Sequence, residues 1–250
     1  MPLHKSEAIV VRSRDLRETS LMLTFYTKDF GKVHGVIKGV RGSRACYGGG
    51  AFELFAHDEI VFYERKRSEF FLVSQCDLLD FFYPIRADLE RIGYAAYLIE
   101  LLDSLTPLGD KNEHIFELLL KCLELSSGTT SARRVARIFE IRLLSLLGIM
   151  PVVNSCVQCR GSNVGPARFS LKLGGVVCGK CAGADRTAGS ILPGTIEFIK
   201  HVERSDLDMV SRIKVSERVG RELEALLRKF LDYHIERRLS TVTFLKSIGR

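Results

Sequence analysis

The chain contains no apolar run that reaches the roughly 18 residues of a membrane-spanning helix. Its first residues, Met1 to Glu7, lack the charged head and apolar middle of a signal peptide. Internal repeats and low-complexity tails are also missing. With 250 residues, of which 46% are hydrophobic, the sequence therefore predicts a cytoplasmic protein with two or three small domains.

Catalytic motifs are equally scarce. The six histidines show neither H-E-x-x-H nor clustered spacing, and there is no G-x-S-x-G nucleophile elbow. Gly174 to Cys181 is similar to a P-loop, but Cys181 stands where a magnesium-binding Ser or Thr belongs. His201-Val-Glu203 has the H-x-E pattern of zinc deaminases, yet it follows the cysteines instead of preceding them. We therefore expect a protein that is not an enzyme.

Four of the seven cysteines form two C-x-x-C pairs, Cys156 with Cys159 and Cys178 with Cys181, and 18 residues separate the pairs. Four thiolates in this spacing can complete a tetrahedron around one zinc ion, with no position open for a reacting water. The intervening segment is rich in glycine and poor in apolar residues, so it cannot form an apolar core and needs a metal ion to stabilise its fold. Two disulfides or surface thiols are the alternatives. We expect one structural Zn²⁺.

The first third of the chain has a mostly period-two apolar pattern, interrupted by glycines. The strands that it predicts contain residues 9–12, 21–26, 33–37, 60–63 and 70–73. Five short strands leave no unpaired edge strand when they close into a small barrel, so we expect a small closed barrel. An SH3-like barrel is the alternative. Four aromatic residues lie in these predicted strands: Phe25, Tyr26, Phe62 and Tyr63. Their rings either form the barrel core or provide surfaces on which nucleic-acid bases stack.

Beyond Pro84 the apolar period becomes helical. The predicted helices contain residues 89–102, 115–123, 131–148, 193–202 and 216–238, the third starting at Thr130 or Ser131. We expect one helical bundle that the cysteine segment interrupts. The predicted domains are 1–83 for the barrel, 84–150 and 189–250 for the bundle, and 151–188 for the zinc module.

The net charge of +7 is unevenly distributed. Residues 1–44 carry nine Lys or Arg against four Asp or Glu, residues 45–130 carry seven against fifteen, and residues 131–182 carry eight against one. This pattern favours a basic surface for a polyanion beside an acidic surface. The candidate phosphate contacts are Arg12, Arg14, Lys32, Lys38, Arg41 and Arg44, with Arg133, Arg134 and Arg137 extending them or serving a separate site. An ordinary solvated surface is the alternative.

Several segments in order resemble one protein family. They are Glu18 to Leu23, Gly31 to Val33, Lys38 to Arg44 and Arg137 to Pro151, followed by the two cysteine pairs. Their order and spacing resemble the RecO family of bacterial recombination mediators. The resemblance implies an OB-fold, a helical domain and an inserted zinc module. It also implies a nucleoid-associated protein that binds single- and double-stranded DNA, anneals complementary strands and, with RecR, helps load recombinase onto DNA coated by single-stranded DNA-binding protein.

The resemblance further implies recognition of the acidic C-terminal tail of the single-stranded DNA-binding protein. Such a tail needs an apolar groove with cations at its rim, and we place it on the helix 131–148. The residues of this predicted site are Arg137, Phe139, Arg142, Leu143 and Leu147. Bundle core is the alternative for the apolar members.

Two other functions stay open. A zinc-ribbon nuclease or transferase could bind magnesium through Asp58 and Glu59, or through Asp77 and Asp80. A zinc-ribbon RNA-binding or transcription factor would share the same charge pattern.

Overall fold

The computed structural model describes residues 2–16, 20–39, 51–64, 70–162 and 165–248. Contacts divide the chain into two compact units, Met1–Ala132 with Leu239–Arg250, and Arg133–Arg238. Among the described residues, no helix combines the length and the apolar character that a membrane span requires.

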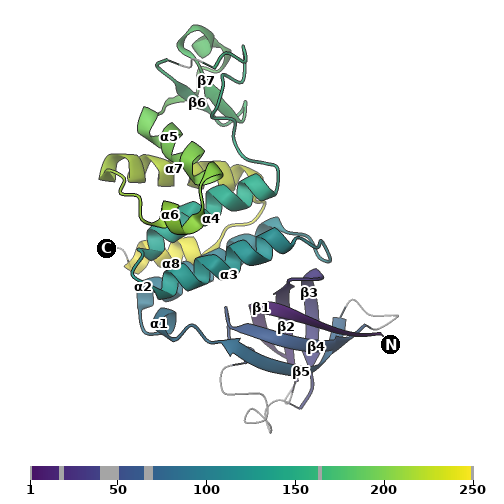
Figure 1. The fold of residues 1–250 in the computed structure, drawn as a ribbon. Coiled ribbons are helices and arrows are strands. Elements are labelled where there is room, and N and C mark those ends of the chain that lie inside the picture. The colour runs from purple at the N-terminus through teal and green to yellow at the C-terminus, as the bar shows by residue number, and fades with distance from the viewer. Residues whose placement is uncertain (1, 17–19, 40–50, 65–69, 163–164, 249–250) are drawn as a thin grey trace. The chain divides into compact units, whose positions relative to one another are not determined.

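Five strands of the first unit form a closed barrel (Figure 1). They are β1 (Leu3–Leu16), β2 (Ser20–Thr27), β3 (Gly31–Ile37), β4 (His57–Tyr63) and β5 (Phe70–Asp80). Their order around the barrel is β1-β2-β3-β5-β4, and β4 pairs back onto β1. Only the β3–β5 pair is parallel among these strands. The predicted OB-fold barrel is confirmed.

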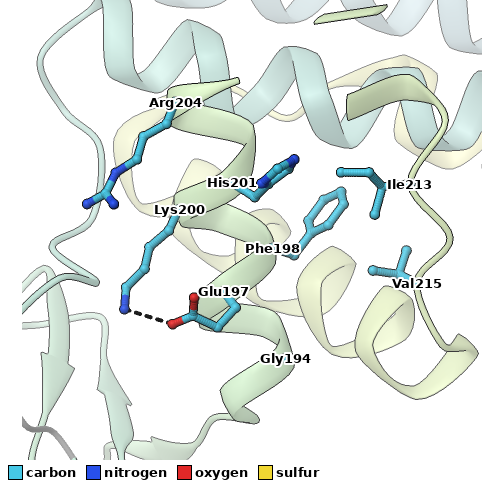
Figure 2. A pocket seen from close by; sticks show the side chains of 8 residues that line it. All are labelled: Gly194, Glu197, Phe198, Lys200, His201, Arg204, Ile213 and Val215. Atoms are coloured by element: carbon cyan, nitrogen blue, oxygen red, sulfur yellow. Dashed lines mark hydrogen bonds and ion pairs between the residues drawn. The ribbon is translucent and has the colours of Figure 1, made fainter. Parts of the chain in front are cut away.

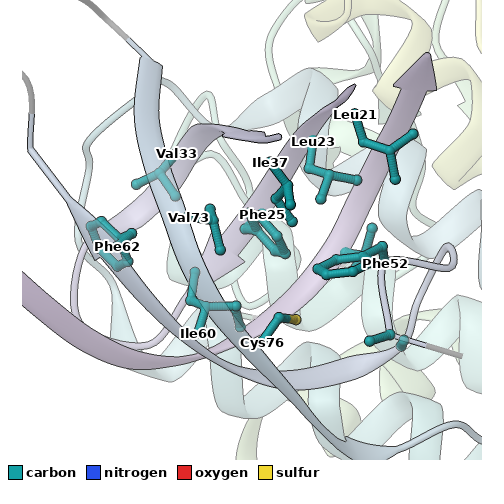
Figure 3. Close-up of a cluster of buried hydrophobic side chains, with 14 residues drawn as sticks. Leu21, Leu23, Phe25, Val33, Ile37, Phe52, Ile60, Phe62, Val73 and Cys76 are labelled. Carbon is teal, nitrogen blue, oxygen red and sulfur yellow. The ribbon is translucent and has the colours of Figure 1, made fainter. Parts of the chain in front are cut away.

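Alternation of side chains along these strands fills the barrel interior (Figure 3). The core includes Phe25 and Phe62, and Tyr26 is also fully buried. None of these three rings can receive a base, so the core interpretation is correct for them. Tyr63, at the end of β4, is only half-buried.

Helices of the first unit are α1 (Tyr83–Arg86), α2 (Leu89–Leu105), α3 (Glu113–Ser127) and α8 (Ser240–Ile248). Side-chain caps start the two long ones: Asp88 accepts a hydrogen bond from the Arg91 N–H, and Asn112 accepts one from the Ile115 N–H. The connection from α2 to α3 lies against β3. At Gly31, where φ is +64°, a Cβ would lie 2.0 Å from the Asp110 carbonyl oxygen, so only glycine fits.

The second unit contains α4 (Ala132–Leu146), α5 (Pro193–Arg204), α6 (Leu207–Ser211) and α7 (Glu217–His234). Ser216 caps α7, where a helix start was predicted. The cysteine segment adds a small sheet in the order β7-β6-β8 and a 3₁₀ helix, Gly179–Ala184. The strands are β6 (Arg168–Ser170), β7 (Gly175–Val177) and β8 (Gly189–Ser190).

This grouping of the helices differs from the predicted single bundle, because α2, α3 and α8 belong with the barrel. The physical reason is that α2 and the segment after it bind β3, because Lys32 contacts Asp103 and the Gly109 N–H donates to the Lys32 carbonyl, and that α8 is in turn bound to α2. The carboxylate of Glu100 in α2 accepts hydrogen bonds from the N–H and hydroxyl groups of both Ser240 and Thr241. These four bonds hold the start of α8 on α2.

One acidic side chain lies inside the barrel. Asp58, at the start of β4, is fully buried, and its carboxylate accepts a hydrogen bond from the Phe52 N–H at 3.4 Å. Burial raises its pKa to about 6, although the Phe52 N–H, the Cys76 thiol and the positive charge of Arg86 each lower it. The folded protein therefore binds this proton more tightly than the unfolded chain does.

We expect Asp58→Asn to stabilise the barrel above pH 7. The folded pKa of about 6 exceeds the ordinary value of 3.8, so the stabilising contribution of the protonated carboxyl is complete below pH 3.8 and is lost as pH rises through 6. The neutral amide avoids this loss. In urea unfolding at pH 8, the free energy of unfolding of the variant should exceed that of the wild type by an amount on the order of 2–3 kcal/mol. This difference should shrink toward pH 4. Asp77→Asn, at an exposed position of β5, serves as the control. A constant difference between the variant and the wild type across this range would contradict the assignment.

Candidate metal centre and nucleic-acid interface

The four cysteines of the second unit lie together. Their sulfur atoms are all within 4.8 Å of one another, and the Sγ atoms of Cys159 and Cys178 are 3.9 Å apart. A disulfide requires about 2.05 Å between its sulfurs, so this pair is not bonded. A zinc ion with Zn–S bonds of about 2.3 Å places its four sulfurs about 3.8 Å apart. The cluster thus fits one tetrahedral Zn²⁺.

Backbone geometry positions these thiols. The Cys156 N–H donates to the Gly161 carbonyl at 3.0 Å, which closes the first C-x-x-C turn, and the 3₁₀ helix after Cys178 carries Cys181. The apolar cluster beneath them is small, with Cys156, Val177 and Cys178 buried in it. A metal ion would therefore supply much of the stability of this segment.

Electrostatics within the cluster favour a bound cation. Burial opposes ionisation of the Cys156 thiol, but the N–H groups of Cys178, Cys159 and Gln158 outweigh it and lower the pKa to about 6. The pKa of Cys181 is instead raised to about 12, first by a hydrogen bond with the Cys178 side chain and then by burial. Four thiolates this close repel one another unless a divalent cation binds between them.

We expect one zinc ion per chain, bound by Cys156, Cys159, Cys178 and Cys181. Replacing Cys156 and Cys159 together by Ser should remove the metal and expose residues 151–188 to protease, while the barrel stays folded. Metal analysis of reduced protein and limited proteolysis measure the two effects. Cys122→Ala, which removes a buried thiol outside the cluster, should retain the metal. Zinc that persists in the double variant would disprove this ligand set.

Two of the cations that were predicted to contact phosphates, Lys32 and Arg12, instead bind Asp103 of α2. The Lys32 ammonium lies 2.8 Å from the Asp103 carbonyl oxygen and 3.2 Å from its carboxylate, and Lys32 is only 8% exposed. Arg12 forms an ion pair with the other oxygen of the same carboxylate. Lys32 therefore does not offer its charge to a ligand at the surface, and Arg12 offers only part of it.

The other barrel cations lie farther along the strands. Arg14 and Lys38 are both exposed. Arg14 pairs with Met22 and Met22 pairs with Val36, so Arg14 and the end of β3 lie at the same end of the barrel's outer surface. Arg41 and Arg44 lie outside the described residues.

The sequence analysis overlooked one basic segment, Arg65-Lys66-Arg67, between β4 and β5. Three consecutive cations are a visible signal, and the β4–β5 connection of an OB-fold is one of the loops that contact oligonucleotides. The segment lies outside the described residues, so its role is inferred from its place in the sequence alone.

The residues proposed for the partner tail, which lie on α4 and directly after it, are largely interior. Phe139 and Leu143 are fully buried, whereas Leu147 is half-buried. The Arg137 guanidinium lies 2.7 Å from the buried carboxylate of Glu140. Truncating Arg137 would remove the ion-pair partner of a buried charge, which costs on the order of 3–5 kcal/mol. A loss of binding in an Arg137 variant would therefore not separate a lost contact with the tail from a lost fold.

Arg142, the other cation of that predicted site, donates to the backbone carbonyls of Glu203 and Ser205 at the C-terminal end of α5. Arg134 similarly donates to the Ser211 carbonyl, and Arg133 forms an ion pair with Glu224. The basic face of α4 is therefore bound within its own unit.

A pocket of about 450 Å³ lies beside α5. Figure 2 shows Phe198 and His201 of α5 directed toward Ile213 and Val215, which precede α7, while Lys200 and Arg204 point to the other side of the helix. Lys200 forms an ion pair with Glu197 at 2.9 Å. The pocket thus combines an apolar wall with cations.

The first of the two magnesium sites considered from the sequence, Asp58 with Glu59, does not form. Asp58 faces the barrel core, and Glu59 binds the ammonium of Lys5 at 2.7 Å. Within the part of the chain that the structure describes, the cysteines are the one cluster of three or more side chains that could bind a metal.

An OB-fold barrel with exposed cations, joined to helices and a four-cysteine cluster, has the architecture of nucleic-acid-binding proteins. Two family models match the chain: Recombination protein O N terminal over residues 1–82, and Recombination protein O C terminal over residues 86–242. The chain therefore belongs to the RecO family of DNA repair proteins.

Curated relatives agree with this assignment. The chain is 38% identical to the DNA repair protein RecO of Pelotomaculum thermopropionicum, in an alignment that covers 100% of this chain and 96% of the relative. It is 34% identical to DNA repair protein RecO of Desulforamulus reducens, over 98% of this chain and 94% of the relative. The similarity extends over both units.

Proposed function

We propose that this protein is a recombination mediator that binds single- and double-stranded DNA, anneals complementary strands and, with RecR, helps load recombinase onto DNA coated by single-stranded DNA-binding protein. The exposed cations at one end of the barrel, Arg14 and Lys38, are the observation that carries this proposal. Membership of a DNA repair family supports DNA as the polyanion.

The proposed action is binding without a covalent step. Annealing brings two polyanions together, so their repulsion must be neutralised by cations that fix neither strand in one register. Long exposed side chains such as Arg14 and Lys38 meet this requirement, because they contact phosphates and not base edges. The metal centre, whose four cysteine ligands leave no open position, would serve as a scaffold.

The double variant Arg14→Ala with Lys38→Ala should weaken binding to single- and double-stranded DNA of any sequence. Each lost phosphate contact makes log K against log salt shallower by about 0.9 for duplex and about 0.7 for single strands. Fluorescence anisotropy at several salt concentrations measures both slopes, and annealing without ATP should slow in parallel. Lys5→Ala is the control, because Lys5 is an exposed β1 cation that pairs with Glu59. An unchanged slope in the double variant would exclude this surface.

Magnesium-dependent DNA cleavage, or a preference for RNA, would favour the enzyme or the RNA-binding alternative.

We further propose that the acidic tail of the single-stranded DNA-binding protein binds the pocket beside α5. A tail that ends in an apolar residue and a free carboxylate requires both a wall and a cation. Ile213 and Val215 offer the wall on one side of α5, and the exposed cation Arg204 lines the pocket from the other side of this helix, so a bound tail would lie across α5. The α4 residues considered from the sequence are less accessible, as their burial and internal pairing indicate.

Arg204→Ala should weaken binding of a synthetic tail peptide about tenfold, since a hydrogen bond to a charged group contributes about 1.5 kcal/mol. Calorimetric titration with the free-acid peptide and with its C-terminal amide tests the role of the carboxylate. Arg221→Ala, at an exposed cation of α7, is the matched control. Equal peptide affinities for folded Arg204→Ala and the wild type would rule out this pocket.

A further inference from the structure

Strand register arranges the outer surface of the barrel in rows. One row crosses four strands and consists of Arg14, Met22, Val36 and Leu72. Side chains directly opposite one another in paired strands point to the same face, and Leu21 and Ile37, the neighbours of Met22 and Val36 along their strands, are in the core. The row therefore lies on the outside, with a cation at its β1 end and half-buried apolar side chains along the rest.

The next row contains a pair of stacked rings. His34 of β3 pairs with Phe70 of β5, and their ring centroids are 5.7 Å apart with an angle of 27° between the planes. The Thr24 hydroxyl lies 3.1 Å from His34 Nδ1, which fixes the orientation of the imidazole. Both rings are half-buried, in contrast to the fully buried Phe25 and Phe62.

We propose that Phe70, supported by His34, is a stacking platform for an unpaired base of single-stranded DNA, whose backbone contacts Arg14. This inference rests on the proposed DNA-binding function and adds a preference for single strands. Four neighbouring strands span about 14 Å, which brings the ring pair and the cation within reach of one short single-stranded segment. In a duplex both faces of an internal base are covered by its neighbours, so only unpaired bases can use the platform.

The chemistry of the row favours a base over other ligands. Base–aromatic stacking contributes about 1–3 kcal/mol per base and tolerates any sequence, because every base has a flat π-face. Met22, Val36 and Leu72 add apolar surface and have no hydrogen-bonding groups that would read base edges. The platform should thus distinguish single from double strands without distinguishing sequences.

The decisive variant is Phe70→Leu, which keeps an apolar side chain and removes the aromatic face. Affinity for single-stranded DNA should fall about fivefold or more, whereas affinity for duplex stays unchanged. The slope of log K against log salt should also stay unchanged, because stacking releases no counterions. Phe70→Tyr retains a ring and should retain the affinity. Tyr83→Leu, which removes an exposed aromatic ring from α1, is the matched control.

Stacking also has a direct spectroscopic signature. The fluorescence of a 2-aminopurine base in single-stranded DNA should be quenched by the wild type and by Phe70→Tyr, but not by Phe70→Leu. The wild-type signal decides the matter even if Phe70→Leu fails to fold, since absence of quenching on wild-type binding would overturn the platform. An equal loss of single- and double-strand affinity in folded Phe70→Leu would overturn it as well. Wild-type protein that bound no DNA would instead refute the proposed function itself.

Discussion

The arrangement of the first unit depends on the ion pairs that the Asp103 carboxylate forms with two barrel strands. This carboxylate is nearly buried, and it neutralises both Arg12 of β1 and Lys32 of β3 while the backbone carbonyl of Asp103 accepts a further hydrogen bond from Lys32. Removing one partner from a buried ion pair leaves an uncompensated charge, which makes the three groups a single structural unit. Because α2 binds Arg12 and Lys32, their charges are largely used within the unit, whereas Arg14 and Lys38, farther along the same strands, are exposed. The position of the DNA-binding surface that we propose is thus a consequence of how the barrel binds its own helix.

The second unit uses charge in a similar way. Glu140 is fully buried on α4 and is balanced by Arg137, while Glu222 of α7 accepts hydrogen bonds from the Leu192 N–H and the Thr195 hydroxyl at the start of α5. The cysteine cluster concentrates negative charge when its thiols ionise, and one metal ion bound between them would balance it. Most of the basic residues of α4 are consequently bound within the unit, even though residues 131–182 are the most cationic part of the sequence. Net charge along a sequence is therefore a poor guide to where a polyanion can bind.

Local patterns predicted the elements well. Period-two alternation identified all five barrel strands, Ser216 indicated the start of α7, and cysteine spacing alone indicated the metal cluster. Features that depend on distant partners were not predictable in this way. Nothing near Lys32 in sequence identifies Asp103 as its partner, and the helix α8 is capped by Glu100, which lies 140 residues from Ser240. The grouping of α2, α3 and α8 with the barrel was missed for the same reason.

If the chain anneals strands as we propose, the same surface would give annealing a direction. Phosphate contacts from a few exposed cations are weak and exchange readily, so they hold both single strands and the duplex without fixing either. A stacking ring acts differently, because it binds a base only while that base is unpaired. On this proposal, the bases of two paired strands would stack on one another and lose contact with Phe70, while the cations at the edge of the surface would stay engaged. Affinity would then fall as the product forms, and the protein would release duplex in favour of the next single strand.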